Sequence, residues 1–201
     1  VGTSLLNPAK PFMELWYQVG KEFPDFKLHL IPYEDDKGGI LSVIHNLGVK
    51  YDFLIGACES RKWLKECNML QLGAYKMMCA VSREHRLASK EELTLSDLCK
   101  ETLMMVAKGD SYENDRLRTE LINNYPDIKI EDTAHFYDMN VFNRCVASQN
   151  VLITLECWKD VHPALVTIPV KWDYQIPYGL LYALEPHEYV IKYIDCVKKI
   201  L

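Results

Sequence analysis

Segments typical of β-strands and segments typical of helices alternate along almost the whole chain, and this alternation is the strongest constraint on its fold. The strand-like segments are short and apolar, and apolar residues at helical spacing follow most of them after a polar turn. Such alternation indicates an α/β architecture whose sheets are mostly parallel. The predicted strands are 1–3, 27–33, 52–56, 77–81, 102–106, 128–130, 151–155, 165–170 and 178–184, and the predicted helices are 8–23, 38–47, 112–125, 138–148 and 186–201.

Local residues mark where several of these helices begin. Asn7 is predicted to cap the first helix, with Pro8 in its first turn. Thr94 can cap a short helix whose third position, Asp97, reaches back as in a capping box. Ser111 is predicted to cap the long helix that follows it. Polar turns therefore stand directly before helices at several points along the chain.

Length, composition and charge narrow the class of protein. The 201 residues suffice for one large domain or two small lobes, and the 49% hydrophobic fraction is that of an ordinary globular protein. With a net charge of −5, the chain is not expected to have a broad basic surface that binds nucleic-acid phosphates. These residues are therefore not expected to bind DNA by themselves. No apolar run approaches the roughly 20 residues that a membrane span needs. The opening VGTSLLNP lacks the basic and apolar segments of a signal peptide, and we expect the chain to be a fragment of a longer protein.

The cysteines and histidines do not form a recognisable metal or redox motif. The seven cysteines cannot all pair, and none forms a CxxC motif, so free thiols in a reducing cytosol are expected. A regulatory disulfide between Cys58 and Cys67, nine residues apart, is the alternative interpretation. The six histidines are dispersed without ligand spacing, and the sequence contains no GxSxG, HExxH, P-loop or GxGxxG motif. We therefore expect no metal, no cofactor and no catalytic residues.

Three turns could contribute to a ligand site, because open α/β sheets bind ligands beyond the carboxyl ends of their strands. The first turn is 3–7, whose hydroxyl and backbone N–H groups could hold a carboxylate, or could simply begin a helix. The second is 56–58, where small residues allow close backbone approach. The third is 107–111, where Lys108 would favour an anion unless Asp110 and Glu113 offset it in a solvated, charged loop. Parallel strands would bring these turns to one edge.

The sequence motifs that are most specific to a known family lie between Met77 and Ser111, in the stretches AVSREHRLA and LTLSDL. Together with DFLIGA and PYGLLYA, these stretches resemble the effector-binding domain of LysR-type transcriptional regulators, and the resemblance covers essentially the whole chain. In that family the loop containing His85 is structural. Arg86 stands where the family pattern usually has proline, which puts the family's loop conformation in question here.

The resemblance implies a two-lobed type 2 periplasmic-binding-protein fold with two crossing strands between the lobes. Lobe I would comprise residues 1–77 and 179–201, and lobe II residues 78–178. A winged helix-turn-helix domain would lie upstream of residue 1, and DNA would be bound only through that domain. The implied protein is a cytoplasmic homodimer or tetramer, without enzymatic activity or membrane contact, that senses a small-molecule effector between its lobes.

Helix N-termini at the shared edge of the parallel strands favour a small anion or carboxylate as the effector. The resemblance places the turns 3–7 and 107–111, Asn140 and Thr154-Leu155 in the effector cleft, and the strand geometry adds the turn 56–58, which together give the expected contact residues. These residues are Thr3, Ser4, Leu5, Leu6, Gly56, Ala57, Cys58, Lys108, Gly109, Ser111, Asn140, Thr154 and Leu155. Two other classes share the fold and stay open. One is an extracytoplasmic solute-binding protein, which the cysteines and the opening residues disfavour. The other is a two-lobed enzyme, such as a dehydratase of aromatic biosynthesis, which substrate turnover would reveal.

Overall fold

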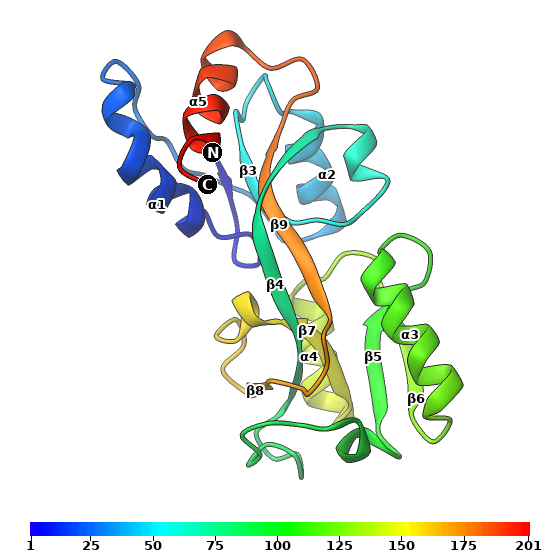
Figure 1. Cartoon of the computed structure of the whole chain (residues 1–201). Helices are drawn as coiled ribbons and strands as arrows, with labels where there is room; N and C mark the ends of the chain where they lie inside the picture. The colour runs from blue at the N-terminus through cyan, green and yellow to red at the C-terminus, as the bar shows by residue number, and fades with distance from the viewer. The chain divides into compact units, whose positions relative to one another are not determined.

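The computed structural model describes residues 1–201, apart from the side chain of Lys37. The chain divides into two compact units, one formed by Val1–Gly73 with Pro177–Leu201 and the other by Ala74–Ile176. Both boundaries fall inside strands, namely β4 (Asn68–Ser82) and β9 (Gln175–Tyr182), and the predicted crossings at 77–80 and 179–183 overlap these strands. Helices and strands alternate along the chain (Figure 1), so the predicted α/β class is confirmed.

Unit 1 contains a mixed sheet whose strand order is β2-β1-β3-β9-β4. Strand β1 runs parallel to both β2 and β3, and β9 runs antiparallel to β3. The bounds are Gly2–Thr3 for β1, Ile31–Pro32 for β2 and Leu54–Ala57 for β3. The helices are α1 (Lys10–Val19), α2 (Lys37–His45) and α5 (Glu188–Lys198), with 3₁₀ turns at Gly20–Glu22 and Trp63–Lys65.

The core of unit 1 is rich in aromatic side chains. Helices α1 and α5 lie against each other (Figure 1) and turn their apolar faces toward the sheet. Burying each large apolar side chain contributes about 1.5–3 kcal/mol, so these two faces hold the unit together. The core residues from the two helices and the sheet include Phe12, Leu15, Val19, Phe53, Ile55, Leu180, Val190, Tyr193, Ile194 and Val197.

Unit 2 contains the strands β8-β4-β7-β5-β6 in that order. Strand β5 runs parallel to β6 and β7, whereas β4 runs antiparallel to β7 and β8. The bounds are Thr102–Val106 for β5, Lys129–Thr133 for β6, Val151–Leu155 for β7 and Leu165–Ile168 for β8. The helices are α3 (Tyr112–Asn124) and α4 (Met139–Ser148), with 3₁₀ turns at Leu95–Leu98 and Glu156–Trp158. Leu103, Met104, Leu117, Leu121 and Cys145 are fully buried in its core.

The structure corrects three local predictions. Helix α1 begins at Lys10 after Ala9, so Asn7 is not its cap, and the Ala9 amide instead donates to Thr3 Oγ1 over 3.1 Å. The predicted strand 27–33 shrinks to β2, whose second residue is a proline without an N–H group. Strand β4 begins at Asn68, nine residues before the predicted start at 77. Propensity alone missed the two strand ends because neighbouring strands decide how far a strand extends.

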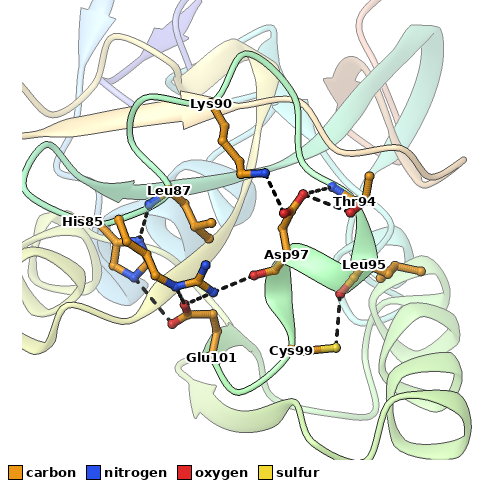
Figure 2. A network of polar contacts seen from close by, with 9 residues as sticks. His85, Leu87, Lys90, Thr94, Leu95, Asp97, Cys99 and Glu101 are labelled. Carbon is orange, nitrogen blue, oxygen red and sulfur yellow. Dashed lines mark hydrogen bonds and ion pairs between the residues drawn. The ribbon is translucent and has the colours of Figure 1, made fainter.

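The loop between β4 and β5 is held by a polar network in unit 2 (Figure 2). The Asp97 carboxylate accepts hydrogen bonds from the Thr94 amide and hydroxyl, both over 2.9 Å, which confirms the predicted capping box around a 3₁₀ turn. Arg86 donates to the Asp97 carbonyl over 2.7 Å and pairs with Glu101 over 2.5 Å. Arg86 therefore holds this loop by one hydrogen bond and one ion pair.

Replacing Asp97 by asparagine is expected to lower the melting temperature at pH 7 by about 2–4 °C, as loss of one cap does in a chain of this size. Hydrogen bonds from Lys90 and Thr94 lower the pKa of Asp97 from 3.8 to about 2. A depressed pKa contributes stability above the unfolded value, and this is lost as pH falls. The difference between wild type and variant should therefore close between pH 4 and pH 2 in thermal melts, and a constant difference would contradict the assignment.

Candidate functional site

In unit 1, three segments meet at one edge of the sheet. Because β1, β2 and β3 are parallel, their carboxyl ends share that edge, and the segments that follow them lie there. These segments are the turn 3–7, the segment 33–36 and the turn 56–58. The first and third of them were predicted as ligand turns, whereas the second, which brings Tyr33 and Asp35 to the same edge, was not.

The carboxylate of Asp35 occupies the turn that was predicted to hold a ligand's anion. One oxygen accepts from the Ser4 hydroxyl over 2.5 Å, and the other accepts from the Leu6 amide over 2.9 Å. Ser4 Oγ in turn accepts from the Asn7 amide over 3.1 Å. The Leu6 and Asn7 amides of this turn are therefore already used within the chain, by Asp35 and by Ser4. A ligand group that donates a hydrogen bond fits beside Asp35 better than a second anion.

Small and polar groups surround this turn. The Asn7 side-chain oxygen lies 3.7 Å from the position that a Cβ on Gly56 would occupy, so the first and third predicted turns adjoin within unit 1. The Tyr33 ring lies beside Ser4 and Asn7, and burial raises the pKa of its hydroxyl, which therefore stays protonated. Leu5 is exposed, whereas Leu6 is buried in the core. Of the two leucines in this turn that were predicted to contact an effector, only Leu5 is exposed to solvent.

In unit 2, the second set of predicted residues also shares one edge. Strands β5, β6 and β7 are parallel, so the turn 107–111 after β5, the start of α4 after β6 and the end of β7 lie at their carboxyl ends. Asp138 caps α4 by accepting from the Val141 amide over 3.1 Å, and Asn140 is exposed beside it. The topology thus places Lys108, Asn140 and Leu155 at a common edge.

An in-chain carboxylate occupies the turn of unit 2 as well. Both Asp115 oxygens accept from the Gly109 amide over 3.1 Å, and Ser111 Oγ accepts from the Asn114 amide over 3.4 Å. Gly109 has a φ of +114°, a conformation that favours glycine. The Gly109 amide of this turn is therefore used within the chain, whereas the Lys108 side chain is exposed. Sequence analysis missed Asp115 because it lies inside the helix, beyond the turn.

Thr154 is the most deeply buried polar residue among the predicted site residues. It is 2% exposed, and its hydroxyl finds no hydrogen-bond partner among the residues that the structure describes. A buried hydroxyl without a partner is costly, so such a group commonly faces a water molecule or a ligand. Thr154 pairs with Met78 of β4 in the sheet of unit 2.

No disulfide joins the cysteines among the residues that the structure describes, and four of the seven are buried. Cys58 and Cys67 are both buried and are not joined to each other, so the alternative of a disulfide between them is not realised. Burial raises the pKa of Cys67 to about 11 and that of Cys145 to about 12, which keeps both thiols protonated and unreactive at neutral pH. Within the described part of the chain, no cluster of His, Cys, Asp and Glu side chains is arranged to bind a metal ion.

Solved structures match this fold over nearly the whole chain, although no protein-family model and no curated protein matches the sequence. CbnR, a LysR family transcriptional regulator, matches with a TM-score of 0.67 at 11% identity, over 99% of this chain and 68% of CbnR. The effector-binding domain of QuiR in complex with shikimate gives 0.62 at 14% identity, over 99% and 94% of the two chains. The BenM effector-binding domain with its effector benzoate gives 0.58 at 11% identity, over 100% and 90%.

The chain therefore has the fold of LysR-type effector-binding domains, the type 2 periplasmic-binding-protein fold, which confirms the predicted fold class. At these identities the likeness establishes the fold. Among the described residues, no helix is both long enough and apolar enough to cross a membrane.

Proposed function

We propose that this chain is the ligand-sensing domain of a LysR-type transcription regulator and binds a small-molecule effector. The observation that carries the proposal is the match of 99–100% of the chain to effector-binding domains. The sequence of the loop containing His85 supports the proposal independently. The contacts of His85 within the loop give this residue the structural role that the family resemblance implies. In the proposed whole protein, an upstream winged helix-turn-helix domain contacts DNA and the regulator works as a cytoplasmic homodimer or tetramer.

The proposed mechanism is a shift between arrangements of the two units. Strands β4 and β9 each contain a boundary between units, so small changes in their backbone are the proposed hinge. An effector can shift the balance only by binding one arrangement more tightly than the other. The proposed contacts come from both units, namely the turns 3–7 and 56–58 of unit 1 and the turn 107–111, Asn140, Thr154 and Leu155 of unit 2.

The in-chain carboxylates refine the proposed effector chemistry. Asp35 already accepts from the Leu6 amide and Asp115 from the Gly109 amide, so we propose that the Lys108 side chain holds an effector carboxylate. The group that faces Asp35 would be a hydroxyl or another hydrogen-bond donor, because a second anion beside Asp35 would be repelled. We therefore propose a small carboxylic acid that also bears a donor. Shikimate has both features and benzoate has only the first, which makes them a discriminating pair of probes.

A thermal-shift screen of small carboxylic acids, including shikimate and benzoate, tests this proposal. An effector at 100 times its Kd is expected to raise the melting temperature by about 5–10 °C. Lys108→Ala should reduce the shift for every acid that binds, because it removes the proposed partner of the carboxylate. Asp35→Asn should reduce the shift only for acids that bear a donor. Lys159→Ala, at another exposed lysine of unit 2, is the matched control and should change neither.

Two outcomes would contradict the proposed chemistry. If the 3–7 turn bound the effector carboxylate, Asp35→Asn would increase the shift for all acids, because the competing in-chain anion would be neutralised. Stabilisation confined to neutral ligands would argue against any carboxylate effector. Turnover of a ligand that binds would instead identify the chain as a two-lobed enzyme.

A further inference from the structure

Helix α3 of unit 2 holds the candidate turn 107–111 from its first turn. Both oxygens of Asp115 accept a hydrogen bond from the Gly109 amide over 3.1 Å, and Ser111 is the capping residue of the helix. The inner face of α3 is buried in the core of unit 2, where close packing keeps the helix rigid. The order of the turn 107–111 therefore depends on contacts with a rigid helix.

A second face of α3 contacts the residues that stand directly before strand β9. The Tyr174 hydroxyl donates a hydrogen bond to the Glu120 carboxylate, and the guanidinium carbon of Arg116 lies 4.2 Å from the centroid of the Tyr174 ring. Arg116 also donates to the Asp173 carbonyl oxygen over 2.8 Å. Arg116 and Glu120 stand four residues apart, so both contacts come from one face of the helix.

Burial makes these contacts stronger than ordinary surface contacts. Tyr174 is 5% exposed, and burial raises its pKa to about 12, so its hydroxyl remains a donor at neutral pH. A hydrogen bond from a buried hydroxyl to a carboxylate is about twice as strong as one between neutral groups. The guanidinium of Arg116 covers the aromatic ring and adds a cation–π contact. Tyr174 is therefore held to α3 through both its ring and its hydroxyl.

The same segment is joined to strand β4 at Met77. The Met77 amide donates to the Tyr174 carbonyl oxygen over 2.9 Å, and Trp172 Nε1 donates to the Met77 carbonyl oxygen over 2.8 Å. Met77 lies in unit 2, close to the boundary of the units at Ala74. A continuous series of contacts within unit 2 thus runs from Gly109 through α3 and Tyr174 to β4.

We propose that α3 couples the turn 107–111 to strand β4 through its contacts with Tyr174. Whatever orders the turn, whether Asp115 within the chain or a bound effector, then also stabilises the hydrogen bond of the Met77 amide near the boundary of unit 2. Tyr174 is a positioning residue in this scheme. Only the part that an effector plays rests on the proposed function.

Hydrogen exchange of the Met77 amide, followed by NMR, tests the coupling without an effector. Asp115→Ala removes the acceptor of the Gly109 amide and should speed exchange at Met77 about 3–10-fold. Tyr174→Phe keeps the ring and removes the hydroxyl, and it should also speed exchange at Met77. In the double variant, Asp115→Ala should add nothing to the effect of Tyr174→Phe, because the contacts that carry the coupling are already broken.

Two controls separate coupling from a general loss of stability. Lys171 lies in the same segment and forms an ion pair with Glu92 over 3.2 Å, so Lys171→Ala should leave the effect of Asp115→Ala on Met77 intact. The Leu93 amide, which is hydrogen-bonded elsewhere in unit 2, is the reference, and Asp115→Ala should not change its exchange. Where Tyr174→Phe does not fold, Glu120→Gln weakens the same hydrogen bond and takes its place in the cycle.

Additive effects of Asp115→Ala and Tyr174→Phe would overturn the proposal, as would a Met77 amide that does not respond to Asp115→Ala. Equal acceleration at Met77 and Leu93 would overturn it as well. An effector that binds the turn 107–111 should slow exchange at Met77 in wild type but not in Tyr174→Phe. A wild-type chain that binds no effector would count against the proposed function alone, because the cycle of variants needs none.

Discussion

Replacing Leu121 by alanine is expected to lower the free energy of unfolding by about 2–5 kcal/mol, the range for removing a fully buried leucine side chain. Leu121 lies on the inner face of α3 and is 0% exposed in the core of unit 2. The substitution removes apolar contacts and leaves a cavity that rigid neighbours fill only in part. Urea denaturation followed by circular dichroism measures the effect, with the m-value checked for unchanged cooperativity.

The next residue along the same helix provides a matched control. Ile122 is 61% exposed, so Ile122→Ala should change the free energy of unfolding by no more than about 0.5 kcal/mol. Both variants place alanine in the same helix, which equalises the effect of helix propensity. Similar effects of the two substitutions would show that the assignment of the inner face of α3 is wrong.

Replacing Gly179 by alanine is expected to destabilise unit 1 by about 3 kcal/mol or more, because overpacking against backbone cannot relax as overpacking against a side chain does. A Cβ at Gly179 would stand 2.1 Å from the Leu70 carbonyl oxygen and 2.9 Å from Gln71 Cα. Strands β9 and β4 would have to separate at this point. Urea denaturation and near-ultraviolet circular dichroism, which reports the aromatic core of unit 1, measure the loss.

Gly56 is the control for Gly179 because the two glycines face each other in the β3–β9 ladder. A Cβ at Gly56 would meet a flexible methyl of Leu181 at 3.2 Å, and that methyl can move. Gly56→Ala should therefore cost clearly less stability than Gly179→Ala. Equal tolerance of the two substitutions would contradict the close approach of β9 to β4 in unit 1.

Elements with strong local signals could be predicted from the sequence. Strand β7 runs over the predicted residues, Ser111 caps α3 as predicted, and α4 lies within the predicted helix 138–148. Local signals suffice there because the capping side chain and the amide that it binds lie three residues apart. Only the second half of strand β4 was predicted from the sequence. Its first half is fixed by pairing with β9, which lies more than 100 residues later in the chain.

The contacts of the candidate site were even harder to predict from local sequence, because they also depend on the pairing of strands. Residues on the predicted turns lie at the carboxyl edges of parallel strands, as the topological rule indicates. The sequence did not indicate that Asp35 would occupy the 3–7 turn, because this contact depends on the pairing of β2 with β1. The run Glu34-Asp35-Asp36 after a predicted strand was the available signal, since the same rule that selected the other turns applies to it.

Hydrogen–deuterium exchange in the presence of a saturating effector from the carboxylic-acid screen tests the central proposal most directly. One effector bound by both units should slow exchange of the amides of Leu6 and Asn7 in unit 1 and of those around Lys108 in unit 2, together in one titration. The measurement reports each amide separately, so it resolves the two units. Protection confined to the turn of one unit, or protection that spares both turns, would contradict the proposal that the two units sense one ligand.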